Sequence, residues 1–143
     1  YGGLHIATHG KFSTDVNDSY LLTFDGKLTM QTLDQLIGLF RFRQEPLELL
    51  TLSACQTGIG DDRAALGLAG VALKAGARSA LATLWFINDE ASATLISEFY
   101  RQLRDPALSK AVALQRAQQK LLDDRIYGHP AYWSPFLLMN NWL

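Results

Sequence analysis

The sequence predicts one α/β domain whose mostly parallel sheet has helices on its faces. Two observations support this prediction. Short apolar runs alternate along the chain with longer segments of helical periodicity. Four of the six residues at 47–52 are leucines, as expected for a strand buried on both faces. With 143 residues, 48% of them hydrophobic and 19% charged, the chain can bury one substantial core.

The expected strands are short and bounded by glycine, proline or polar residues. The Asp25-Gly26 pair tolerates the positive φ values of a tight turn and therefore predicts a β-hairpin, whereas the preceding polar stretch, 11–19, is expected to be a loop. The strands are expected at 4–9, 20–24, 27–28, 47–52, 78–85 and 136–139.

Four helices are expected, each with a start or stop signal. Thr29 can cap a helix over 30–39, and Gly76 can end a buried helix over 64–75. Asn88 or Asp89 can cap a helix to about 103, and Pro106 separates it from a helix over 109–122. The apolar faces are expected to carry Leu33, Leu36 and Ile37 in the first helix, and Leu95, Ile96, Phe99 and Leu103 in the third.

Composition excludes several classes of partner. The formal net charge of −1 gives no basic surplus for nucleic acid or an anionic membrane. The longest apolar run, 64–75, is interrupted by Gly67, Gly70 and Lys74 and is shorter than the ~20 residues that span a bilayer. A single cysteine cannot form an internal disulfide, so a reducing, cytoplasmic location is expected.

His9 and Cys55 follow two separate expected strands. In parallel sheets, functional sites form at the carboxyl ends of the strands. If these strands are neighbours, both side chains reach the same edge of the sheet. A cysteine attacks as thiolate, and a nearby imidazole lowers the thiol pKa and then protonates the leaving amine. The backbone N–H groups of Gly10 and Cys55 could stabilise the oxyanion. The alternative is that Cys55 is a small buried core residue.

Two segments resemble the His and Cys motifs of CHAT domains, which belong to the caspase-like clan with caspases, gingipains and separase. They are LHIATHG at 4–10 and LSACQTG at 52–58. The 46-residue spacing of His9 and Cys55 is close to the ~50 residues of caspases. Ser53 replaces the glutamine of caspases and Thr57 precedes Gly58, which favours CHAT over a true caspase. The segments at 64–76, 82–89 and 129–136 also resemble CHAT signatures.

The resemblance implies a caspase-like fold of the caspase–hemoglobinase type and a cysteine endopeptidase with a His9–Cys55 dyad. It also implies a protein or peptide substrate, no cofactor, and frequent attachment to TPR-type helical repeats in signalling or defence proteins. Because caspase-like folds have further strands before the His strand, residues 1–143 are expected to be an N-terminally truncated, weakly active part of a longer chain. The alternative function is a CHAT-like interaction module without catalysis.

Two further residues are candidates for substrate binding. Trp85 ends an expected strand at the active edge and could form a pocket wall, although such tryptophans usually belong to the core. Asp89 could select a basic side chain on the amino side of the cut, since separase has a similar Leu-Trp segment followed by an Asp and cuts after Arg. Asp89 could equally cap the next helix.

The other sequence motifs give weaker evidence of a function. His5 and His9 have the spacing of a helical zinc pair, but on a strand they would be ~13 Å apart, so His5 is expected to pack in the sheet and no metal is expected. The run at 58–63 begins like a dinucleotide loop but has Arg63 in place of the third glycine. His129, before Pro130, is expected to be structural.

Overall fold

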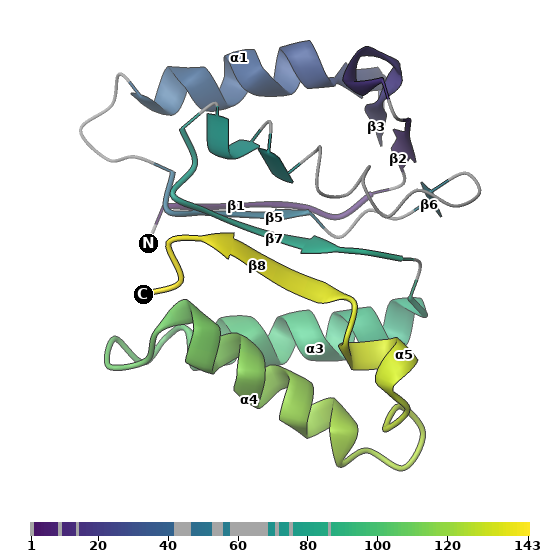
Figure 1. Cartoon of the computed structure of the whole chain (residues 1–143), viewed down its shortest axis with the longest axis vertical. Coiled ribbons are helices and arrows are strands. Elements are labelled where there is room, and N and C mark those ends of the chain that lie inside the picture. The colour runs from purple at the N-terminus through teal and green to yellow at the C-terminus, as the bar shows by residue number, and fades with distance from the viewer. Residues whose placement is uncertain are drawn as a thin grey trace.

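The computed structural model describes residues 2–8, 10–13, 15–41, 47–52, 56–57, 69–70, 72–74, 76–85 and 87–143. A sheet of four strands lies between two layers of helices (Figure 1). Its strand order is β1 (Gly3–Ile6), β5 (Leu49–Leu52), β7 (Ser79–Thr83) and β8 (Phe136–Asn140). β1, β5 and β7 are parallel, and β8 is antiparallel to β7. The predicted α/β fold with a mostly parallel sheet is confirmed.

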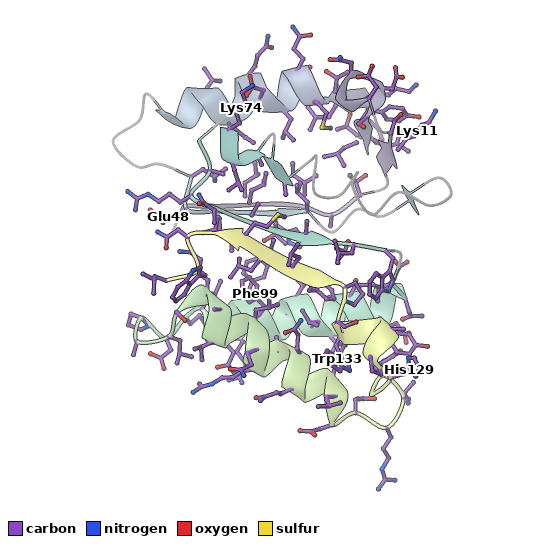
Figure 2. The ribbon with its side chains drawn as sticks, in the orientation of Figure 1. Lys11, Glu48, Lys74, Phe99, His129 and Trp133 are labelled. Atoms are coloured by element: carbon purple, nitrogen blue, oxygen red, sulfur yellow. The ribbon has the colours of Figure 1, made fainter. Side chains whose placement is uncertain are left out.

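Side chains of β5 bury both faces of this sheet. Leu50 and Leu52 belong to the core under α1 (Met30–Arg41), together with Leu33 and Ile37. Leu49 belongs to the opposite core, under α3 (Asp89–Gln102) and α4 (Lys110–Leu122). Figure 2 shows Phe99 of α3 between the sheet and the helices of this second core. Burial on both faces explains the leucine-rich sequence of this strand.

A second, smaller sheet extends from one end of the first. Its order is β4 (Gly26–Thr29), β3 (Tyr20–Thr23), β2 (Gly10–Phe12) and β6 (Gln56–Thr57). The β3–β4 hairpin is confirmed, but its turn residues are Phe24 and Asp25, because Gly26 is already paired with Thr23. The loop prediction for 11–19 is wrong in part: β2 and the 3-10 helix η1 (Val16–Asp18) lie there, since backbone pairing with β3 and β6 outweighs the polar composition.

The helix boundaries follow the predicted caps. The Thr29 hydroxyl accepts from the Thr32 N–H at 3.2 Å, and the Asn88 side chain accepts from Glu90 and Ala91 at 2.9 and 3.2 Å. Ser109 caps α4. Residues 69–70 and 72–74 are helical, and Gly76 ends this segment at φ +116°, where the N–H of Gly76 and of Ala77 bond the carbonyls of Leu73 and Ala72.

Two sequence-based details are corrected, and a third is confirmed. Leu36 is 44% exposed, because the side of α1 that packs on the core carries Met30, Leu33 and Ile37. β7 ends at Thr83, before the predicted 85. The region of His129 contains a short helix, α5 (Pro130–Trp133), whose N-cap is His129 through Nδ1, and this confirms a structural role for that residue.

No helix among the described residues is long and apolar enough to cross a membrane.

A buried carboxylate joins α3 to α4. The side chain of Glu98 is 4% exposed and accepts from Arg101 Nε at 2.9 Å, Gln102 Nε2 at 2.7 Å and Lys120 Nζ of α4 at 3.0 Å. Hydrogen bonding to Arg101, helped by Gln102 and Lys120, lowers the pKa of Glu98 to about 2, against the opposing effect of burial.

We predict that Glu98→Gln lowers the free energy of unfolding at pH 7 by about 1–3 kcal/mol, because three donors lose a charged acceptor. The folded-state pKa lies below the ordinary 4.5, so this stabilisation is present above pH 4.5 and is lost as pH falls towards about 2. Urea unfolding of both proteins at several pH values measures this. Asp34→Asn, an exposed acid on α1, is the control. A difference that does not shrink on acidification would contradict the prediction.

Candidate functional site

The carboxyl ends of three parallel strands form one edge of the main sheet. β1 ends at Ile6, which is paired with Leu52 at the end of β5, and Leu52 is paired with Ala82 near the end of β7. The candidate residues of the sequence analysis therefore all follow strands that end at this edge, as expected for a site in a parallel sheet.

The two chain segments that carry the dyad candidates pair twice. After Ile6↔Leu52 in the main sheet, the same segments pair again in parallel in the small sheet, at Lys11↔Gln56 and Phe12↔Thr57. The offset between partners changes from 46 to 45, so the β1–β2 segment has one residue more than the β5–β6 segment between the two pairings. His9 and Cys55 fall in these intervals, but both lie outside the described residues, and their juxtaposition stays a prediction.

Gly10 is the described member of the proposed oxyanion pair. It is buried and begins β2, where it is paired with the fully buried Leu21 of β3. The pairing of Gly10 with Leu21 therefore fixes the course of the backbone directly after position 9. The role of its N–H group toward an oxyanion stays a prediction.

Trp85 and Asp89 follow β7, on the side of β5 that is opposite to β1. Trp85 is 39% exposed, and its indole N–H donates to the Ala131 carbonyl of α5 at 3.2 Å, which fixes the ring while leaving part of it in solvent. Asp89 is exposed as the first residue of α3. Asn88 and not Asp89 makes the N-cap hydrogen bonds, whereas Asp89 lies in the first turn of α3, where its charge favours the helix dipole.

A polar cluster that the sequence analysis missed lies on the α3 side of the same strands. Tyr100 of α3 donates its hydroxyl to Thr51 Oγ1 at 2.8 Å, and its ring lies 5.6 Å from the ring of His5. His5 and Thr51 are register partners in β1 and β5. Thr51 is only 1% exposed, so its hydroxyl depends on Tyr100. The signal in the sequence was Thr51 itself, a polar residue inside an apolar strand.

This cluster shifts the protonation of two of its members. Burial lowers the pKa of His5, so the ring is biased towards the neutral form. Burial also raises the pKa of Tyr100, partly offset by the hydrogen bond to Thr51. The ring of His5 contacts Tyr100 as expected for a packed residue, although His5 as a whole is exposed. No group of three or more His, Cys, Asp or Glu residues that could hold a metal occurs in the described part of the chain.

Comparison with known proteins decides the family. A family model of the CHAT domain matches residues 1–141, nearly the whole chain. The chain belongs to the CHAT domain family. The fold described above is therefore the caspase-like α/β fold, and CHAT domains belong to a clan of cysteine peptidases.

A curated relative is similar over part of this CHAT domain. The human protein named "Tetratricopeptide repeat protein 28" is 29% identical over 100 residues, which cover 68% of this chain and 4% of that protein. The match thus spans a small part of the relative's length.

We predict that the pKa of His5, measured by NMR titration of its ring, lies below 6.5, because contact with Tyr100 and the strand desolvates the imidazolium. The unfolded chain then binds the proton more tightly, so His5 costs stability as pH falls below about 6.5. Tyr100→Ala, which opens the ring of His5 to solvent, should move the value back towards 6.5. A wild-type value at or above 6.5 would overturn this prediction.

Proposed function

We propose that this CHAT domain is a cysteine endopeptidase in which Cys55 is the nucleophile and His9 the acid/base. The observation that carries the proposal is the double pairing of the segments around these positions. Ile6↔Leu52 precedes them and Lys11↔Gln56 follows them. Adjacent paired strands lie ~4.8 Å apart, so pairing on both sides supports side chains close enough for proton transfer.

The proposed reaction has two steps. The Cys55 thiolate bonds to the scissile carbonyl carbon, and the peptide C–N bond breaks while His9 gives its proton to the leaving amine. A water molecule, deprotonated by His9, then attacks the thioester and releases the new carboxylate and the thiol. Backbone N–H groups of Gly10 and Cys55 would stabilise the oxyanion in both steps.

The similarity to a human tetratricopeptide repeat protein supports attachment of this domain to TPR-type repeats in the same longer chain. We place such a protein in the cytoplasm, where its thiol stays reduced. The alternative function is a CHAT module that binds proteins without cleaving them.

We predict that a thiol-reactive electrophile labels Cys55 in the full-length protein and that Cys55→Ala abolishes both labelling at this site and peptide cleavage. His9→Ala should slow labelling at pH 7 by about tenfold or more, because the thiol pKa returns towards ~8.5 and only a few per cent remains thiolate. His129→Ala, at the N-cap of α5, is the matched control and should label at the wild-type rate. Peptide mapping by mass spectrometry reports each rate.

Two results would contradict this assignment. Cleavage retained in Cys55→Ala would identify another nucleophile. Equal labelling in the wild type and in His9→Ala, without cleavage, would favour the non-catalytic interaction module.

We further propose that Asp89 selects Lys or Arg on the amino side of the cut, with Trp85 as a pocket wall. Three observations support this: both residues follow β7 at the carboxyl edge, the Trp85 ring is held by Ala131, and the cap is made by Asn88 and leaves the Asp89 carboxylate without that role. An exposed carboxylate at this edge attracts a basic side chain and disfavours an acidic one.

We predict that the full-length protein prefers Arg or Lys before the cut and that Asp89→Asn lowers this preference by about two- to fivefold, since a solvent-exposed ion pair contributes ~0.2–1 kcal/mol. A peptide-library profile measures the preference. Asp34→Asn removes an exposed acid from α1 and serves as the control for net charge. An unchanged profile in Asp89→Asn would remove Asp89 from the specificity site.

A further inference from the structure

The outward face of the small sheet begins beside the candidate nucleophile. Lys11 is the register partner of Gln56, the residue after Cys55, and also of Tyr20 in β3. Residues that are paired across strands share a face, so Lys11 and Tyr20 point the same way. Leu21 is fully buried, and its neighbours Tyr20 and Leu22 therefore point outward, Leu22 being 43% exposed. We call the set Lys11, Tyr20, Leu22, Lys27 and Thr29 the outer face.

The outer face is cationic. Lys11 and Lys27 are exposed, and the Lys27 ammonium lies 4.3 Å from the centre of the Tyr20 ring. Figure 2 shows Lys11 at the outside of the molecule beside β2. No acidic residue occurs in β2, β3 or β4. The nearest acid of the hairpin, Asp25, lies in its turn and accepts from Thr23 Oγ1 at 3.0 Å. The two ammonium groups are therefore not neutralised by acids of these three strands.

The strand order indicates on which side of the scissile bond the outer face lies. Both sheets have the same lateral order: β3 and β4 lie beyond the β1–β2 segment, and β7 lies beyond β5 on the other side. The proposed acid, His9, belongs to the β1–β2 segment and must protonate the leaving amine. The part of the substrate that begins with that amine therefore extends over β2 and β3, away from Trp85 and Asp89.

We propose that the outer face binds the substrate segment on the carboxyl side of the cut and that Lys11 selects an acidic side chain there. Lys27, held by Tyr20, contributes a second cation. Substrate residues in extended conformation advance ~3.3 Å each, so the preference falls within the first three residues after the cut. This inference rests on the proposed peptidase function and adds its selectivity on the leaving-group side.

The first test is cleavage of matched peptides by the full-length protein. The peptides differ only by Asp or Asn at the first, second or third residue after the cut. We expect the wild type to favour Asp by about two- to fivefold in kcat/KM at one of these positions, as for a solvent-exposed ion pair. Lys11→Gln should bring the ratio near one, and Lys11→Glu should bring it below one, because the new carboxylate repels Asp. Arg104→Gln, an exposed cation beyond the far end of α3, should leave the ratio unchanged.

The second test needs no catalysis. Fluorescein-labelled peptides that differ only by Asp or Asn at one position of an otherwise identical sequence are titrated onto full-length Cys55→Ala. Tighter binding of the Asp form, weakened about two- to fivefold by Lys11→Gln and by raised salt, supports the outer face. If the wild type cleaves nothing but this binding persists, the peptidase proposal fails and the acid-binding face stands. If the wild type cleaves and neither test depends on Lys11, the face is refuted.

Discussion

The parallel pairing of β1 with β5 is the constraint on which the arrangement of this domain depends. It places Ile6 beside Leu52, and the same two segments continue into the pairing of β2 with β6. Everything at the carboxyl edge is positioned from these two segments: the small sheet and its hairpin on one side, and β7 with Trp85 and Asp89 on the other. A substrate bound across this edge would thus meet a cationic face at one end and an acid at the other.

Packing on both faces of the sheet stabilises that pairing. Leu50 and Leu52 contact the α1 layer, whereas Leu49 and Thr51 face α3, where the Tyr100 hydroxyl satisfies the only polar side chain of β5. Helix α3 is in turn joined to α4 by the hydrogen bond that Lys120 donates to Glu98. The arrangement of the strands at the carboxyl edge therefore depends on contacts that lie well inside the domain. These contacts involve no residue of the proposed chemistry.

Much of the fold could be predicted from local signals. Thr29 and Gly76 marked helix ends, and the stripe of Leu95, Ile96 and Phe99 marked a buried face, because caps and periodicity are written in neighbouring residues. Long-range pairing was harder to predict. Lys11 and Phe12 of β2 were expected to lie in a loop, because pairing with β3 and β6, and not their own propensity, places them in a strand. The exposure of Leu36 likewise depends on where α1 rests on the sheet.

The candidate site, like the fold, could be predicted from the sequence only in part. That His9 and Cys55 follow strands could be read from the sequence, and that these strands are neighbours required the sheet order. Asn88 and Asp89 looked equivalent as caps, and only the hydrogen bonds to Glu90 and Ala91 separate them. The significance of Lys11 was not visible in the sequence, because its partner Gln56 is 45 positions away.

The unequal lengths of the two segments between their pairings limit how this part of the chain can change. Four residues separate Ile6 from Lys11, and three separate Leu52 from Gln56. The strand pairings before and after these two intervals fix both lengths. A single insertion or deletion in either interval would turn the following strand over and exchange its buried and exposed faces. Length variation among related sequences should therefore accumulate in the turns of the hairpin and between the helices, and avoid these two short intervals.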